Sequence, residues 1–157
     1  MAKNNEIVIT RTFDAPKAKV WKAWTDTKLI EQWYGPQGFS TRVEKNDLKK
    51  GGRIRYVMIG PDGKEYPSEG TILEIKKEEK IVSTDEFGDD FAATTKIDLP
   101  KGMISTVLFE EEGQKTKVTI TISHPSAEEK AKHEKMGVVE GYNSQLDKLA
   151  PLLKKIK

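Results

Sequence analysis

Hydrophobic and polar residues alternate with a period of two in seven segments of the chain, which indicates β-strands with one buried face. The alternation begins in "EIVITRTF", where Ile7, Ile9, Arg11 and Phe13 share one face. It is cleanest in "VTITIS", where hydrophobic residues alternate with threonine and serine, as is typical of a half-buried antiparallel strand. The pattern predicts strands over residues 6–13, 38–45, 53–60, 65–77, 80–87, 103–113 and 116–125.

Two short segments after the first strand have the spacing of three or four residues that marks an amphipathic helix. In "DAPKAKVWKAWTD", Asp14 and Pro16 supply start signals for a helix. In "TDTKLIEQWYGP", either Asp26 or Thr27 can cap a second helix, which the Gly-Pro pair at 35–36 ends. We therefore expect two short helices directly after the first strand.

Residues 126–157 show the helical spacing over a much longer segment and predict one long C-terminal helix. Pro151 should kink its last turns or restart the helix after Ala150. Gly137 and Gly141 each cost about 1 kcal/mol relative to alanine inside a helix. These glycines indicate either a bend or close contact, or clearance for a bound molecule or a mobile lid. The apolar stripe consists of Val139, Tyr142, Leu146, Leu149, Leu153 and Ile156.

This order of elements predicts an α+β fold in a single domain that spans residues 1–157. A sheet that is hydrophobic on one face must be covered by another layer. Only the C-terminal helix is long enough to be that cover, at about 1.5 Å per residue. The expected architecture is therefore a curved antiparallel sheet of about six or seven strands with the long helix across it.

Composition narrows the class of function. Hydrophobic residues make up 36% of the chain and charged residues 33%, with a net charge of +2, so no strong field favours nucleic acid or an anionic membrane. The chain has no cysteine, which excludes disulfides and thiolate chemistry. No apolar segment is long enough for a membrane span, and the N-terminus lacks the apolar segment of a signal peptide. We expect a cytoplasmic protein that does not bind nucleic acid.

Few residues point to catalysis or to a cofactor. His124 and His133 lack the spacing of a helical zinc pair, and "HEKMG" has Gly137 where a second histidine would stand. We expect no metal, with both histidines at the surface or at a strand end. "DEFGDDF" (85–91) is interpreted as a solvated loop, or else as a rim that gates a cavity or meets a basic partner. The sequence predicts no catalytic residue and no cofactor.

Arg11 shares a strand face with hydrophobic residues, so its guanidinium is expected to point inward. A buried guanidinium needs a carboxylate, and Glu69 or Glu74 could supply one. Two interpretations stay open: Arg11 forms a structural ion pair, or it anchors the carboxylate or phenolate of a ligand.

Taken together, these segments resemble the SRPBCC (START-like, helix-grip) superfamily. Within it they are similar to the family named for the C-terminal domain of the activator of Hsp90 ATPase. The resemblance covers roughly residues 6–153 and rests on the order and spacing of several short motifs. The matching positions are Arg11, Phe13, Asp14, Ala15, Pro16, Val20, Trp21, Ala23, Trp24, Thr25, Leu29, Trp33, Gly35, Pro36, Gly38, Gly51, Gly52, Pro61, Asp62, Gly63, Gly70, Glu74, Ile75, Gly141, Tyr142, Leu146 and Leu149.

The resemblance implies a helix-grip fold with a cavity between sheet and long helix that often accepts apolar small molecules. Tyr34 and Tyr142 stand where tryptophan is common in the family, which places hydroxyl groups where indole NH groups would be. The chaperone activator has a separate N-terminal domain that contributes to engaging Hsp90, and we expect no such domain in a chain of this length. The family name is therefore a poor guide to activity here.

We predict a protein that binds an apolar or aromatic small molecule in this cavity. One alternative is a co-chaperone that acts on Hsp90 or another protein partner. A second is a cyclase- or hydrolase-like enzyme, which requires at least two titratable groups with perturbed pKa values in the cavity. In a third, side chains fill the cavity. Trp33 and Met136 are expected at the rim, with Arg11 as the potential anchor. The predicted lining residues are Phe39, Tyr56, Met58, Ile72, Phe109, Val139 and Tyr142.

Overall fold

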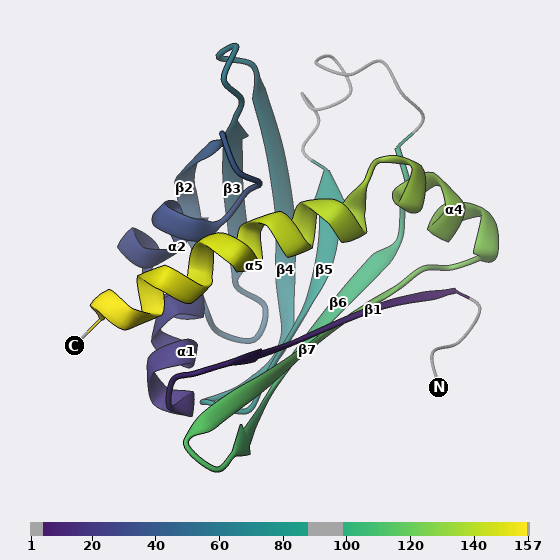
Figure 1. Cartoon of the computed structure of the whole chain (residues 1–157). Helices are drawn as coiled ribbons and strands as arrows, with labels where there is room; N and C mark the ends of the chain where they lie inside the picture. The colour runs from purple at the N-terminus through teal and green to yellow at the C-terminus, as the bar shows by residue number, and fades with distance from the viewer. Residues whose placement is uncertain (1–4, 88–98, 157) are drawn as a thin grey trace.

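A seven-stranded antiparallel sheet forms one layer of the protein, in the order β1-β7-β6-β5-β4-β3-β2. The computed structural model describes residues 5–87 and 99–156. Figure 1 shows helices α1, α2 and α5 over one face of this twisted sheet. Every predicted strand is confirmed, with ends that move by at most two residues. The strands are β1 (Glu6–Phe13), β2 (Ser40–Asn46), β3 (Arg53–Ile59), β4 (Glu65–Lys76), β5 (Lys80–Phe87), β6 (Met103–Glu112) and β7 (Lys115–Ser123).

Both predicted short helices follow β1 directly. Helix α1 (Lys17–Thr25) starts after Pro16, whose fixed φ suits the entry to a helix. Helix α2 (Thr27–Trp33) starts after Asp26, whose carboxylate accepts hydrogen bonds from the backbone N–H groups of Lys28 and Leu29 at 3.0 and 3.2 Å. The two helices are therefore separated by one extended residue, and α2 turns toward the sheet.

The predicted single C-terminal helix is instead two helices, α4 (Ala127–Lys135) and α5 (Val138–Lys155). Gly137 separates them in a left-handed conformation with φ of +79°, which a residue with a Cβ atom rarely adopts. The predicted restart after Ala150 is wrong, because α5 continues past Pro151 to Lys155. The break therefore comes at the glycine and not at the proline.

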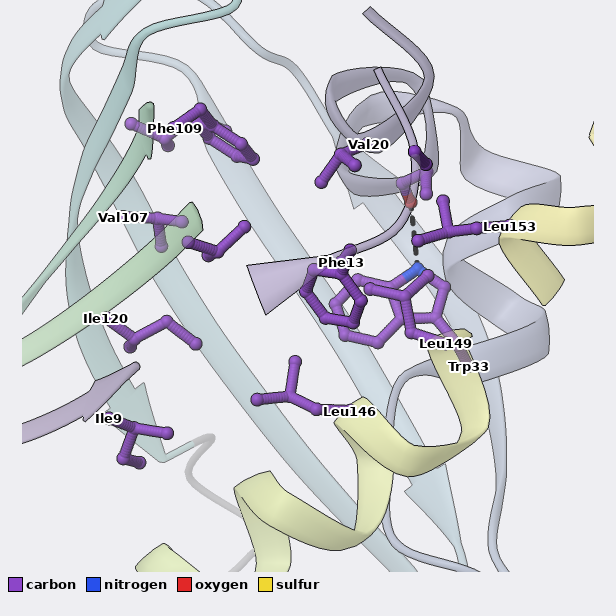
Figure 2. Packing of buried hydrophobic residues seen from close by; sticks show 14 of the residues in the cluster. Ile9, Phe13, Val20, Trp33, Val107, Phe109, Ile120, Leu146, Leu149 and Leu153 are labelled. Atoms are coloured by element: carbon purple, nitrogen blue, oxygen red, sulfur yellow. Dashed lines mark hydrogen bonds between the residues drawn. The ribbon is translucent and has the colours of Figure 1, made fainter. Parts of the chain in front are cut away.

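The core lies between the sheet and the helices and includes the end of the molecule where α1 and α2 pack. Leu146, Leu149 and Leu153 project from α5 toward Phe13 and Trp33 (Figure 2). All five side chains are buried, and each contributes on the order of 1.5–3 kcal/mol by leaving water. The indole Nε1 of Trp33 donates a hydrogen bond to the carbonyl oxygen of Ala23 at 2.8 Å, which joins α2 to α1.

Side chains of α5 fix this helix to elements on both of its sides. On one side, the guanidinium of Arg11 in β1 donates to Asp147 at 2.9 Å and to Asn143 at 3.2 Å. The predicted partners of Arg11 were wrong: Glu69 pairs with two arginines of β3, and Glu74 pairs with Lys80.

On the other side, α5 holds the turn that follows α2. The backbone N–H groups of Gly35 and Gln37 donate to Gln145 Oε1 and Ser144 Oγ, both at 2.8 Å. Lys148 Nζ donates to the carbonyl oxygens of Gly35 and Phe39. The helix is therefore anchored along its middle, while its first turn depends on the Gly137 junction. None of the described helices is both long and apolar enough to cross a membrane.

Candidate functional site

A cavity lies between the sheet and the first half of α5. It consists of an outer chamber of about 420 Å³ and a narrower inner chamber of about 90 Å³. The outer chamber is within the usual range for small-molecule sites, roughly 300–1,000 Å³. Its lining combines aromatic and aliphatic side chains with a few polar groups: Tyr34, Pro36, Phe39, Met58, Tyr66, Ser68, Asp85, Phe87, His133, Met136, Gly137, Val138, Gly141, Tyr142 and Gln145.

The inner chamber extends from the outer one toward α1 and α2. Trp24 and Trp33 form part of its wall, together with inward-facing residues of β3 to β7. The third interpretation of the sequence, a cavity filled entirely by side chains, is therefore wrong. The lining residues are Trp24, Trp33, Tyr34, Leu48, Ile54, Tyr56, Ser68, Glu69, Ile72, Ile81, Ser83, Thr84, Asp85, Ser105, Val107, Ile120, Tyr142 and Gln145.

Five residues line both chambers, and all five carry polar groups. We call this set the polar junction: Tyr34, Ser68, Asp85, Tyr142 and Gln145. They come from the end of α2, from β4, from β5 and from α5, so separate parts of the fold converge here. A ligand that occupied both chambers would pass these groups, which makes the polar junction the natural place for specific recognition.

Asp85 reaches the cavity through the alternation of β5. Ile81, Ser83, Asp85 and Phe87 follow at intervals of two and face the cavity together. Burial raises the pKa of the Asp85 carboxyl from 3.8 to about 6, and the charge of the neighbouring Glu86 adds to the effect. This corrects the interpretation of "DEFGDDF" as a solvated loop for residues 85–87, which belong to β5; residues 88–91 lie outside the described part of the chain.

Three tyrosines stay protonated in the cavity wall. Burial raises the pKa of Tyr34 to about 12, with a further contribution from the charge of Asp85. Burial raises the pKa of Tyr142 well above its usual value, and the neighbouring Tyr34 and then the charge of Asp85 add to the effect. The Tyr56 hydroxyl donates to Asn46 Oδ1 at 3.0 Å, and burial raises its pKa too. All three hydroxyls are therefore hydrogen-bond donors at neutral pH.

The two histidines meet beneath α4, although they are nine positions apart in the sequence. Their predicted surface or strand-end location is half correct: His124 directly follows β7, but both side chains are buried. His124 Nδ1 lies 2.8 Å from the carbonyl oxygen of Asn5, and His124 Nε2 lies 3.0 Å from His133 Nδ1. His124 therefore donates from Nδ1 to that carbonyl oxygen, and one of the two facing ring nitrogens donates to the other.

Protonation of His133 is unfavourable in this environment. Burial lowers its pKa to about 4, and the adjacent His124 adds to the effect. His133 therefore contributes a neutral ring to the outer chamber at physiological pH. Within the described residues, no three histidine, aspartate or glutamate side chains come close enough together to hold a metal ion.

Gly141 lies on the stripe of α5 that faces the cavity. Val138, Gly141, Tyr142 and Gln145 follow at helical spacing, and all four line the outer chamber. A Cβ atom at position 141 would meet nothing within 4 Å, and the residue does not have a positive φ. Neither close packing nor backbone conformation therefore requires glycine here, and the side-chain space at this turn of the helix is empty.

Most of the predicted lining residues come together in the cavity. Phe39, Met58 and Met136 line the outer chamber, Trp33, Tyr56 and Ile72 line the inner one, and Tyr142 lines both. Trp33 was expected at the rim, but it is buried at the inner end because its indole completes the contact between α2 and α1.

Three predicted residues lie elsewhere. Phe109 packs edge-on against Trp21 and Trp24, with ring centroids 5.2 and 5.5 Å apart. Val139 is exposed, because the cavity-facing stripe of α5 passes through its neighbour Val138. Arg11 forms the structural ion pair described above and lines neither chamber.

The sequence-based prediction missed four of the five polar-junction residues as ligand contacts. Tyr34 was noted only as an unusual hydroxyl, and Ser68, Asp85 and Gln145 were not singled out. The signal for Asp85 was present, because it continues the inward alternation from Ile81. Gln145 had no comparable signal, since its role depends on the Gly35 N–H group it binds.

A twisted antiparallel sheet covered by a long helix, with a cavity of ligand size between them, defines the helix-grip class. The chain belongs to the family described as Activator of Hsp90 ATPase homolog 1-like protein, whose model matches residues 14–154. No curated protein matches the sequence significantly.

Solved structures agree with this assignment. A Staphylococcus epidermidis protein, determined by solution NMR, is 34% identical with a TM-score of 0.81, over 100% of this chain and 94% of the other. Protein Ms6760 from Mycobacterium smegmatis is 28% identical with a TM-score of 0.84, over 97% and 92%. The AHSA1 protein from Silicibacter pomeroyi, 23% identical with a TM-score of 0.71 over 95% and 97%, shares the fold.

Proposed function

We propose that the protein binds an apolar or aromatic small molecule in the cavity between the sheet and α5. The observation that carries this proposal is the outer chamber itself, which has the volume of a small-molecule site and a largely apolar lining. The family commonly binds small hydrophobic ligands, which agrees with this geometry.

Gly141 adds independent support. Glycine inside a helix costs about 1 kcal/mol relative to alanine, and neither packing nor backbone conformation requires it at this position. A ligand that lies against α5 would explain the glycine, since a side chain at position 141 would occupy the space of the ligand. This favours the clearance interpretation of Gly141, whereas Gly137 is explained by the break between α4 and α5.

Native mass spectrometry of the purified protein tests the proposal. We expect a co-purifying compound, or one selected from a hydrophobic library, that raises the thermal unfolding midpoint. Gly141→Leu should fill part of the outer chamber and abolish binding without loss of stability. Ala150→Leu adds the same side chain at an exposed position of the same helix and should bind like the wild type. A wild-type protein that binds nothing, or equal binding by Gly141→Leu, would contradict the proposal.

Catalysis is a second candidate function, because the cavity contains the titratable groups with perturbed pKa values that an enzyme requires. Asp85, Tyr34 and Tyr142 converge on the cavity, and all three have perturbed pKa values. Such groups suit general acid–base chemistry on a bound carbonyl compound. Mass spectrometry of a metabolite extract incubated with the protein should then show a compound that wild type consumes and Asp85→Asn does not. Identical extracts after both incubations would count against an enzyme.

A protein partner such as Hsp90 has weaker structural support. In the described part of the chain, the exposed large hydrophobic residues are spread over four elements: Val8 in β1, Leu73 in β4, Ile104 in β6 and Val139 in α5. Docking surfaces normally gather such side chains into one patch.

A further inference from the structure

Asp85 is the charged group of the cavity that has no counter-charge among residues 5–87 and 99–156. Glu69 lines the inner chamber, but Arg53 and Arg55 both pair with it. His133 lines the outer chamber as a neutral ring. In the same residues, no hydrogen bond or ion pair reaches the Asp85 carboxylate. Among the described residues, the ionised Asp85 carboxylate therefore faces the cavity without a paired cation.

The position of Asp85 gives that charge a recognition role. It lines both chambers, so a molecule bound in either chamber can lie beside it. Aromatic rings lie around the same point: Tyr34 and Tyr142 belong to the polar junction, and the rings of Tyr34 and Tyr56 are 5.1 Å apart at their centroids. The faces of such rings are electron-rich and attract cations.

We infer that the ligand is an apolar or aromatic molecule that carries a basic amine, whose protonated nitrogen binds the Asp85 carboxylate at the polar junction. This inference rests on the proposed small-molecule binding and specifies the ligand's chemical class. The ammonium group supplies the missing counter-charge, and the apolar part of the molecule fills the outer chamber.

Other ligand classes match this site less well. A purely apolar molecule would exclude water from Asp85 without replacing its hydrogen bonds, which is costly for an ionised group. An anionic ligand would place a second negative charge beside the first. A neutral hydroxyl group can donate one hydrogen bond to Asp85 but provides no charge. The site should therefore rank a cation above a neutral molecule, and a neutral molecule above an anion.

Binding should depend on pH through Asp85. The titratable groups around it are Glu86 on its own strand, Tyr34 after α2, Tyr142 on α5 and His133 on α4. Both tyrosines titrate far above neutral pH, and His133 titrates near 4. Because the Asp85 pKa is about 6 and an alkylamine stays protonated below pH 9, amine affinity should fall as pH drops from 8 to 5.

Three probes of one shape test the inference: 1-naphthylmethylamine, 1-naphthylmethanol and 1-naphthoate. Isothermal titration at pH 8 should give an amine affinity at least tenfold above that of the alcohol, with the carboxylate weakest. Asp85→Asn keeps the side-chain shape and should remove most of the amine's advantage, while alcohol affinity changes less than twofold. Glu86→Gln removes the adjacent exposed charge and should retain the preference.

The outcomes distinguish a failure of amine recognition by Asp85 from a failure of small-molecule binding itself. If the alcohol binds as tightly as the amine, or if Asp85→Asn keeps the amine's advantage, the inference is wrong and small-molecule binding stands. If none of the three probes binds the wild type at millimolar concentration, and native mass spectrometry also finds no ligand, both fail. A preference that Asp85→Asn removes and Glu86→Gln retains, and that declines below pH 6, supports the inference.

Discussion

The two halves of α5 cover the same sheet, but one half packs against the core and the other half lines the cavity. In the C-terminal half, Leu146, Leu149 and Leu153 are buried against α1, α2 and the strands, and no chamber is lined by them. In the N-terminal half, Val138, Gly141 and the polar-junction residues of α5 face the cavity. One helix thus fills the interior at one end of the molecule and leaves a cavity at the other. We call the part around Leu146, Leu149 and Leu153 the sealed end, and the part around Val138, Gly141 and Tyr142 the open end.

This difference between the two ends follows from the size and chemistry of the side chains on the inward-facing stripe of α5. Leucines at spacings of three and four fill the interior at one end. At the other end, a glycine and polar side chains occupy the inward stripe, and the helix junction at Gly137 adopts a left-handed conformation that suits glycine. We infer that the sealed end provides most of the stability and that the open end gives up stability for the binding proposed above.

The largest effect should come from the sealed end. Leu149→Ala removes a fully buried side chain, and we expect the free energy of unfolding to fall by about 3 kcal/mol. For a protein of this size the melting temperature should drop by roughly 10 °C. Chemical denaturation with a constant slope would measure the change. A loss below about 1 kcal/mol would show that this end is less tightly packed than the structure indicates.

At the open end we expect a smaller effect of the opposite sign: replacing Asp85 should raise the free energy of unfolding. Its folded pKa of about 6 is above the unfolded value of 3.8, so the folded state binds the proton more tightly. The resulting stabilisation is present below pH 4 and is lost as pH rises through 6. Since the group faces the cavity, we expect Asp85→Asn to stabilise the protein at pH 8 by about 1–2 kcal/mol, with little difference at pH 4.

The matched comparison between wild type and Asp85→Asn is needed because His133 titrates in the same range with the opposite sign. Its folded pKa of about 4 is below the usual 6.5, so its contribution is lost as pH falls from 6.5 toward 4. This contribution is common to both proteins and cancels in their difference. If Asp85→Asn were less stable than wild type at pH 8, Asp85 would have a structural partner.

The sealed end could be predicted from the sequence in most respects, because it rests on periodicity. The alternation from Ile7 to Phe13 and the leucine stripe of the last helix are local patterns, and both faces are buried as predicted. Asp26 caps α2 through side-chain bonds that span only two and three positions. Such features depend on neighbours in the chain.

The open end was predicted less completely, because its groups meet only in three dimensions. The same limit applies outside the cavity: Asp147 is 136 positions from Arg11, and nothing in the sequence favoured it over Glu69. The contact between His124 and His133 depends on how α4 folds back over β7. The break at Gly137 could have been predicted, since a glycine after three basic residues at 132, 133 and 135 is a common helix end.

The smallest expected change in stability, that of Gly141→Ala, tests the difference between the two ends most directly. Gly141→Ala adds one methyl group to the cavity-facing stripe, where a Cβ atom meets nothing within 4 Å. Because alanine is the better helix former, we expect a gain of up to about 1 kcal/mol in the free energy of unfolding. Ligand affinity should fall over the same substitution, since the methyl group occupies space in the outer chamber. Ala150→Gly, at an exposed position of α5, should lose a similar amount without any change in affinity. A Gly141→Ala protein that gained stability and bound as tightly as wild type would show that the open end gives up stability for something other than the ligand.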